Sequence, residues 1–228
     1  MSEAFYKDKL YPLQDRVLKE IGRLESKLYL TGGTVVGRFL LHHRYSDDLD
    51  FFLNRSDYFH DEVDNVIEVV KTCGSVEISF RDTDFVRIFV THENVRLKVE
   101  FVNDVGYRVG VPTKHPFGFQ IDNWQNILAN KLTALSRLAG KDYVDILFLS
   151  LKYEFNWEEF INHSKQKDAW IAEHEVANFL LNFDLKKLNE VSFPKNINLS
   201  VINAVHFKTL AKDAFNGFNN SLYGIKLF

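Results

Sequence analysis

The sequence has little of what marks secreted or membrane proteins. Its 228 residues include a single cysteine, Cys73, which excludes an internal disulfide and favours a reducing compartment. No apolar run reaches the length of a membrane span, and the first ten residues, MSEAFYKDKL, do not resemble a secretory signal peptide. We therefore expect a cytoplasmic protein with no membrane partner.

A strong charge of either sign is lacking as well. The 28 basic and 31 acidic side chains give a net charge of −3, which provides no overall attraction for nucleic acid. Any nucleic-acid site must therefore be a local patch. The composition is instead typical of a globular protein with an aromatic-rich core, with 46% hydrophobic residues, 21 Phe and 9 Tyr.

The hydrophobic pattern changes near residue 112. Before that point helical and strand periodicities alternate. Helices are predicted over residues 8–24, 33–42 and 57–72, and strands over 27–31, 48–53, 75–80, 84–91 and 95–102. Beyond residue 122 the pattern is helical, over 123–138, 141–152, 157–166, 171–182 and 199–216. We expect an α+β fold, with an α/β core in residues 1–112 and a helical domain in residues 113–228.

Gly32 and Gly33 lie between a predicted strand and a predicted helix. This arrangement exposes backbone N–H groups at a helix N-terminus, and the small glycines let phosphate oxygens approach the backbone. The dipeptide therefore indicates an anion site, and a tight turn without a ligand is the alternative interpretation.

Two aspartates follow inside an apolar strand, which is costly unless they bind something. Asp48 and Asp50 are two residues apart, so both project from one face while Leu49 and Phe51 face the core. Like charges at this spacing repel, and Mg²⁺ is a cation that takes carboxylate oxygens. An exposed sheet edge is the alternative, and Asp47 falls on the opposite phase.

Glu100 is a third carboxylate on a predicted strand, on the face opposite Leu97, Val99 and Phe101. If its strand neighbours that of the two aspartates, the three acids converge into a two-metal site for phosphoryl transfer. The alternative is a solvated Glu100 paired with Lys98 or Arg96.

The helical half carries a second set of charged residues. Lys131 lies in a polar gap of an apolar helix, where its ammonium suits a phosphate, and Arg137 is about 60° away around that helix. Asp142 and Asp145 share a face at the first turn of the next helix. Asp142 either positions Lys131 or Arg137, acts as a base, or only complements the helix dipole.

The combination resembles a known family. GGT followed by HRYSDDLDFF, and NWQNILANKLTALSRLAGKDYVDILFL at 123–149, are similar to the AbiEii/AbiGii-type nucleotidyltransferase toxins of type IV toxin–antitoxin systems. These belong to the DNA polymerase β-like nucleotidyltransferase superfamily. Its motifs correspond here to Gly32-Gly33, Asp48-x-Asp50, an acid at Glu100, Lys131 and the Lys141-Asp142-x-x-Asp145 element. The resemblance covers residues 29–149, about half of the chain.

The resemblance implies a polymerase-β-like core with a mixed sheet and flanking helices, followed by a helical C-terminal half. It implies transfer of a nucleoside monophosphate from an NTP to an acceptor, with RNA such as a tRNA 3′ end as the expected acceptor, Mg²⁺ or Mn²⁺ as cofactor and a cognate antitoxin as partner. The implied metal ligands are Asp48, Asp50 and Glu100, with Lys131 and Asp142 as further catalytic residues. The implied NTP-binding residues are Gly32, Gly33, Thr34, Arg44, Ser46, Lys131, Arg137 and Asp145.

Two alternatives stay open. The same chemistry can act on a small molecule or a protein, and the fold can serve as a non-catalytic module that binds NTP or a partner. The intact acids and glycines favour an enzyme. A basic groove would favour RNA over a small molecule, formed by Lys165, Lys167, Lys186, Lys187 and Lys195.

Overall fold

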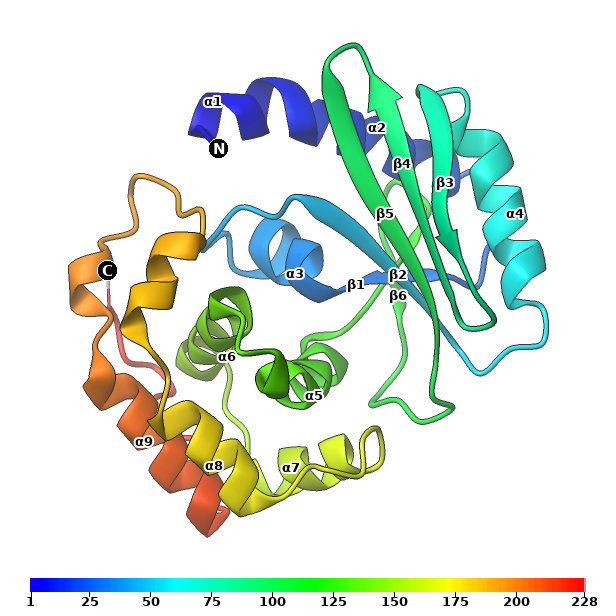
Figure 1. Cartoon of the computed structure of the whole chain (residues 1–228). Coiled ribbons are helices and arrows are strands. Elements are labelled where there is room, and N and C mark those ends of the chain that lie inside the picture. Colours follow the sequence, from blue (N-terminus) through cyan, green and yellow to red (C-terminus); the bar gives the residue numbers. More distant parts are fainter. Residues whose placement is uncertain (228) are drawn as a thin grey trace. The chain divides into compact units, whose positions relative to one another are not determined.

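The computed structural model describes residues 1–227 and divides the chain into two compact units (Figure 1). Unit 1 comprises Met1–Val35, Ser46–Gly106 and Val111–Asn123. Unit 2 comprises Val36–Tyr45, Tyr107–Gly110 and the chain from Trp124 onward. The chain thus passes between the units several times, and the single boundary expected at residue 112 stays a prediction.

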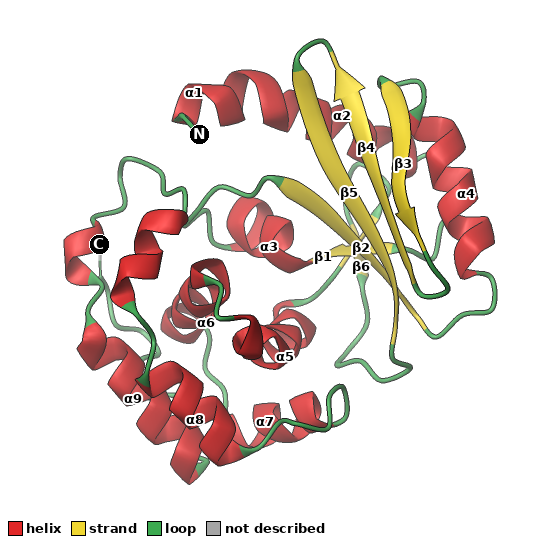
Figure 2. Ribbon diagram, in the orientation of Figure 1, coloured by secondary structure: helices red, strands yellow, loops and turns green. Residues whose placement is uncertain are grey.

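Unit 1 contains a seven-stranded mixed sheet in the order β3-β4-β5-β2-β1-β7-β6 (Figure 2). The strands are β1 Tyr29–Thr31, β2 Asp48–Asn54, β3 Ser75–Arg81, β4 Phe85–His92, β5 Val95–Asp104, β6 Thr113–Lys114 and β7 Gln120–Ile121. The pairs β2–β5 and β1–β7 are parallel and the others antiparallel. With the helices described below, this sheet confirms the predicted α+β fold.

The strict alternation of β4 and β5 explains why the sheet has one covered face. In β5, Leu97, Val99 and Phe101 are fully buried, whereas the residues between them are more exposed. The apolar stripe of α2 Tyr11–Ile21 packs against β5 and against α4 Phe59–Val70. The short α1 Glu3–Phe5 and the π-helix η1 Tyr6–Leu10 precede α2. The core of unit 1 therefore lies on this face of the sheet.

The predicted helix after the Gly-Gly pair is present. Strand β1 leads into α3 Gly32–Thr34, which continues as the π-helix η2 Val35–Leu40. Strand β2 then begins at Asp48 and returns antiparallel to β1. The turn and the two aspartates are therefore on adjacent strands.

Unit 2 is helical. Its elements are α5 Trp124–Thr133, η3 Ala134–Arg137, α6 Gly140–Lys152, α7 Trp157–Lys165, α8 Glu173–Leu181, η4 Leu185–Glu190, η5 Leu199–Val201 and α9 Ala204–Asn216. All five helices predicted for the C-terminal half appear, although the last begins only at Ala204, where Asn203 caps it. Helix α6 is largely buried and contacts α5, η4 and α9. Among the described residues, no helix has the length and apolar character needed to cross a membrane.

Candidate active site

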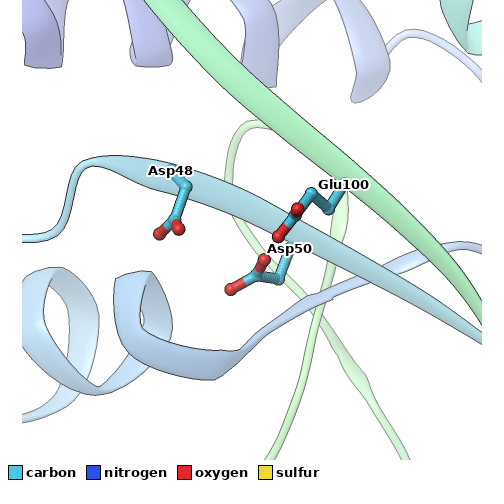
Figure 3. A group of neighbouring side chains, drawn as sticks. All are labelled: Asp48, Asp50 and Glu100. Atoms are coloured by element: carbon cyan, nitrogen blue, oxygen red, sulfur yellow. The ribbon is translucent and has the colours of Figure 1, made fainter. Parts of the chain in front are cut away.

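Three carboxylates converge on the face of the sheet opposite α2 and α4 (Figure 3). Strands β2 and β5 are parallel neighbours, with Asp50 opposite Glu100. One oxygen from each of Asp48, Asp50 and Glu100 lies within 4.8 Å of the others. The condition set by the sequence, that these strands are neighbours, is met, and the structure brings the three predicted metal ligands together. Their roles in binding and catalysis stay predictions.

Positive charge already lies among these acids. The Lys98 Nζ is 3.1 Å from Asp48 Oδ2 and 2.9 Å from Glu100 Oε2. The Arg87 Nε donates to Glu100 Oε1 at 2.6 Å. Partial burial opposes ionisation of Glu100, but Lys98 and Arg87 outweigh it and hold its pKa below the usual value. Burial likewise opposes the charge of Lys98, and its carboxylate partners nevertheless raise its pKa.

This arrangement fits a divalent cation. An all-oxygen set of three carboxylates is the donor chemistry that Mg²⁺ and Mn²⁺ prefer. The Lys98 ammonium shows that a cation is stabilised at this position. The simpler expectation for Glu100, pairing with Lys98, is also met, but its second partner is Arg87 and not Arg96.

The absence of a side chain at Gly32 leaves room for the carboxylate of Asp50. Its φ of +68° is in the left-handed region, and an added Cβ would lie 2.7 Å from Asp50 Oδ2. Thr34 is fully buried, and its Oγ1 donates to the backbone carbonyl of Asp48. Since that hydroxyl is engaged, Thr34 fastens β2 to the turn, and any contact with a phosphate has to come from its backbone N–H.

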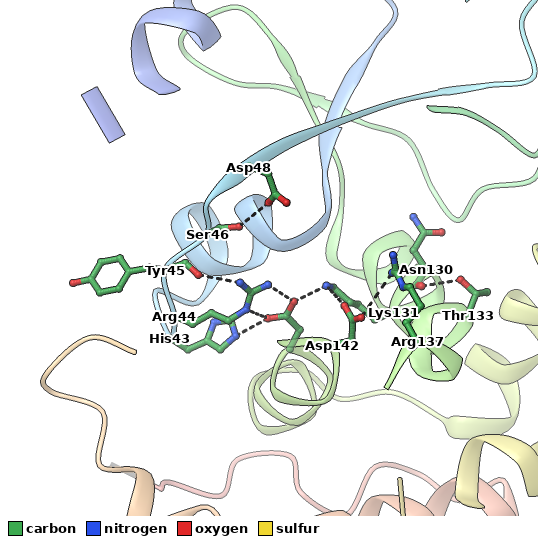
Figure 4. A network of polar contacts seen from close by, with 11 residues as sticks. His43, Arg44, Tyr45, Ser46, Asp48, Asn130, Lys131, Thr133, Arg137 and Asp142 are labelled. Carbon is green, nitrogen blue, oxygen red and sulfur yellow. Dashed lines mark hydrogen bonds and ion pairs between the residues drawn. The ribbon is translucent and has the colours of Figure 1, made fainter. Parts of the chain in front are cut away.

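Ser46 lies beside the acids in unit 1. Its Oγ donates to Asp48 Oδ1 at 3.5 Å, as marked in Figure 4. Its backbone N–H donates to the Tyr11 hydroxyl, and its carbonyl accepts from Gln14 at 3.2 Å. These contacts support the expectation that Ser46 orients Asp48. Gln14 and Tyr11 were not predicted, because both lie in the periodic pattern of helix α2.

Unit 2 holds a separate buried ionic cluster, which we call the Asp145 cluster: His43, Arg44, Lys131, Asp142 and Asp145 (Figure 4). Arg44 donates from Nε and NH2 to the two oxygens of Asp145, at 2.6 and 2.7 Å. Lys131 Nζ is 2.7 Å from both Asp142 and Asp145. His43 Nε2 is 2.9 Å from Asp145 Oδ1. Buried charges require such partners, so the cluster accounts for these residues without a ligand.

The pKa shifts follow from this pairing. Burial would raise the pKa of Asp145, but Arg44 and Lys131 outweigh it and hold the pKa well below its usual range. Burial would lower the pKa of Lys131, and its two aspartates raise it instead. For His43 burial dominates over Asp145 and lowers the pKa, so its imidazole is neutral at pH 7.

The structure does not place Lys131 and Arg137 on one continuous α-helix, which the expected angle of about 60° between them assumes. Helix α5 ends at Thr133 and continues as the 3₁₀-helix η3, which changes the angle per residue. Lys131 is buried, whereas 68% of the Arg137 side chain is exposed, with NH2 3.8 Å from Asp142 Oδ2. The predicted contacts of both residues with NTP stay predictions. His43 was not predicted, although it directly precedes Arg44.

Comparisons with solved structures agree with this fold. Two solved structures from Helicobacter pylori, JHP933 and a candidate nucleotidyltransferase, are each 19% identical to the chain. Their TM-scores are 0.59 and 0.60, each match covers 95% of this chain, and it covers 94% and 96% of theirs. At this identity the likeness shows the fold. No curated protein matches the chain.

The class of the protein follows from its family. Its family is one of nucleotidyltransferases. Residues 16–218 match the model of the nucleotidyl transferase AbiEii toxin family of type IV toxin–antitoxin systems, and the chain belongs to this family. The resemblance found in the sequence is thereby confirmed, and the match extends it well beyond residue 149.

Replacing Gly32 with alanine tests the space for Asp50. Gly32→Ala should lower the free energy of unfolding by at least about 1–2 kcal/mol, the cost of a left-handed alanine. It should also weaken Mn²⁺ binding, measured by titration of the free Mn²⁺ EPR signal, because the new Cβ displaces the Asp50 carboxylate. Gly106→Ala is the control, since its Cβ meets no atom closer than 3.8 Å. Equal effects of the two substitutions would contradict this account.

Removing the Lys98 charge should favour the metal. In Lys98→Met the carboxylates of Asp48 and Glu100 lose their shared ammonium, so the metal-free protein should melt at a lower temperature and gain more from Mn²⁺. Because the ion pairs that Mn²⁺ must displace are partly exposed and therefore weak, their removal should tighten Mn²⁺ binding by up to about fivefold. Arg96→Met is the control, because Arg96 pairs with Glu77 instead. Weaker Mn²⁺ binding in Lys98→Met would show that the ammonium and the metal do not compete.

Asp145→Asn should destabilise unit 2. It leaves Arg44 and Lys131 buried with less negative charge, at a cost of about 3–5 kcal/mol in urea unfolding. The folded pKa of Asp145 is lowered, so its stabilisation is complete above the unfolded value of about 3.9 and is lost as the pH falls further. In Asp145→Asn the free energy of unfolding should lack this decrease at low pH. Asp64→Asn, at an exposed pair with Arg81, should change little; a similar loss there would argue against a special role for burial.

Proposed function

We propose that this chain is a divalent-metal-dependent nucleotidyltransferase that transfers a nucleoside monophosphate from an NTP to a hydroxyl of RNA, with a tRNA 3′ end as the leading acceptor. The observation that carries the proposal is the convergence of Asp48, Asp50 and Glu100 around a position already occupied by a cationic group. The family supports the nucleotide chemistry and implies an antitoxin partner.

Mg²⁺ or Mn²⁺ would bind to the carboxylates of Asp48, Asp50 and Glu100. The Lys98 ammonium would then move away from its position between Asp48 and Glu100. Such a metal ion, when bound, stabilises the charge that develops on the transferred phosphoryl group. Gly32 and Gly33 would accommodate the triphosphate, because the first N–H groups of a helical segment lack partners inside the helix.

In the transfer, the acceptor oxygen attacks the α-phosphorus of the NTP. The bond from the α-phosphorus to the bridging oxygen of the β-phosphate breaks, and pyrophosphate leaves with that electron pair. The proton of the acceptor hydroxyl passes to a carboxylate of the site or to water. Ser46, through its bond to Asp48, keeps one carboxylate oriented during this step.

Unit 2 carries the other residues that the family resemblance implies for NTP binding and catalysis. The exposed Arg137 would contact phosphate directly as a cationic fork. Arg44 and Lys131 would bind phosphate only by exchanging their bonds to Asp145, so the geometry favours a positioning role for them and for Asp142. Two of the lysines predicted to form a basic groove already have partners within the chain. Lys165 pairs with Glu173, and Lys167 donates to the carbonyl of Tyr107.

The direct test is incubation of the purified chain with each α-labelled NTP, Mg²⁺ or Mn²⁺, and total cellular RNA. We expect label in an RNA band with a preferred nucleotide, and a loss of at least about 100-fold in Asp50→Asn. Asp47→Asn is the matched control, because this neighbouring acid is exposed and accepts a hydrogen bond from the Tyr6 hydroxyl.

The other outcomes are informative. Label on a protein or a small molecule would replace the RNA acceptor while retaining the nucleotidyltransferase chemistry. Equal activity of Asp50→Asn and Asp47→Asn would contradict the metal site. No transfer to any acceptor, combined with no NTP-dependent thermal shift, would contradict the proposed function.

A further inference from the structure

The open face of the sheet continues beyond the acids toward the edge strand β3. On this side lie aromatic and arginine side chains that we call the aromatic face: Phe80, Phe85, Arg87, Phe89 and Arg96. They are half-buried or exposed, in contrast to Val86, Ile88 and Val90, which alternate with them on β4 and are fully buried. Three large rings left at the surface of one sheet face are unusual enough to indicate an interaction surface.

The register places this face beside the carboxylates. Arg87 on β4 is opposite Glu100 on β5, and Phe89 is opposite Lys98. Phe80 on β3 is opposite Arg87, after a bulge that shifts the register of β3. Paired residues share a face. With strands about 4.8 Å apart, the aromatic face begins next to the metal ligands and ends about 10 Å away, at the sheet edge.

The side chains form stacked pairs that expose flat surfaces. The Arg96 guanidinium lies 3.6 Å from the centroid of the Phe89 ring, and Arg87 lies 5.2 Å from that of Phe85. The rings of Phe80 and Phe85 are 5.8 Å apart, and Phe80 is 49% exposed. Nucleic-acid bases stack on both aromatic rings and guanidinium planes, and arginine also binds phosphate.

The polar surroundings favour RNA over an apolar protein segment. Ser75, Glu77 and Thr91 flank the rings on this face, so an apolar partner would bury polar groups without bonds. The ion-pair partner of Arg96 is Glu77, at 2.9 Å, and half of each side chain or more is accessible. Such pairs contribute little, so a phosphate can replace Glu77.

We propose that the aromatic face binds the last nucleotides of a single-stranded RNA acceptor and directs its 3′ hydroxyl to Asp48, Asp50 and Glu100. This inference rests on the proposed function, because it names the surface that holds the proposed acceptor. Phe80 and Phe85 stack on bases, and Arg96 binds the backbone while its plane covers Phe89. The NTP is held elsewhere, at the Gly32 turn.

The test separates RNA binding from catalysis. Binding of a fluorescent single-stranded RNA is measured by anisotropy at low salt with the full chain, for Phe80→Ala and Arg96→Gln. We expect each to weaken binding about tenfold, as for loss of one stacked base or one phosphate contact. The NTP-dependent thermal shift should be unchanged, and 5-iodouridine photo-crosslinks, mapped by mass spectrometry, should fall on β3 and β4.

The chain offers matched controls. Ile78 lies on the same strand with the same exposure of 49% but pairs with Ile88, so it faces the other side of the sheet. Arg81 lies on the same strand and pairs with Asp64 on α4. Ile78→Ala and Arg81→Gln should therefore leave RNA affinity unchanged.

Three results would overturn the inference. Unchanged RNA affinity in Phe80→Ala and Arg96→Gln would leave the proposed function intact but place the acceptor elsewhere. A dimer in light scattering that Phe80→Ala dissociates, with RNA affinity unchanged, would assign the face to a second copy of the chain. Transfer to a non-RNA acceptor, with no RNA binding by the wild type, would remove this inference together with the RNA acceptor.

Discussion

The structure of unit 1 depends on how three negative charges are kept together on one sheet face. Asp48, Asp50 and Glu100 repel one another, and in this structure Lys98 and Arg87 neutralise that repulsion. Gly32 makes the arrangement sterically possible, because only a residue without a side chain fits beside Asp50 with a left-handed backbone. The acids are therefore held by contacts that a bound cation can replace, which is what a reversible metal site requires.

In unit 2, by contrast, opposite charges are buried together and paired with each other. In the Asp145 cluster every charged group is buried and paired within the unit, and Arg44 binds Asp145 with two parallel hydrogen bonds. Breaking such a cluster is costly, so it favours one fixed arrangement of its helices. The element Lys141-Asp142-x-x-Asp145 thus serves the architecture at least as directly as it serves a substrate, and the exposed Arg137 is a cation of this region that a ligand can reach.

Much of this could be predicted from residue patterns. Period-two alternation assigned Asp48, Asp50 and Glu100 to strand faces opposite the core, because burial of Leu49 and Val99 fixes the phase of each strand. The pairing of β2 with β5 was only conditional, since register depends on contacts distant in sequence. The bridging Lys98 and the pairing of Arg87 with Glu100 follow from that register. The two-residue strands β6 and β7 are too short to leave a periodic signal, and the switch to a 3₁₀-helix after Thr133 changed the expected relation of Lys131 to Arg137.

A crystal structure of the chain with Mn²⁺ and a non-hydrolysable NTP analogue would show whether the three acids bind the metal. The account predicts an anomalous peak about 2.1 Å from oxygens of Asp48, Asp50 and Glu100, with the Lys98 ammonium displaced and the triphosphate at the Gly32 turn. An ion and nucleotide bound away from the three acids, with Lys98 still bridging Asp48 and Glu100, would contradict it.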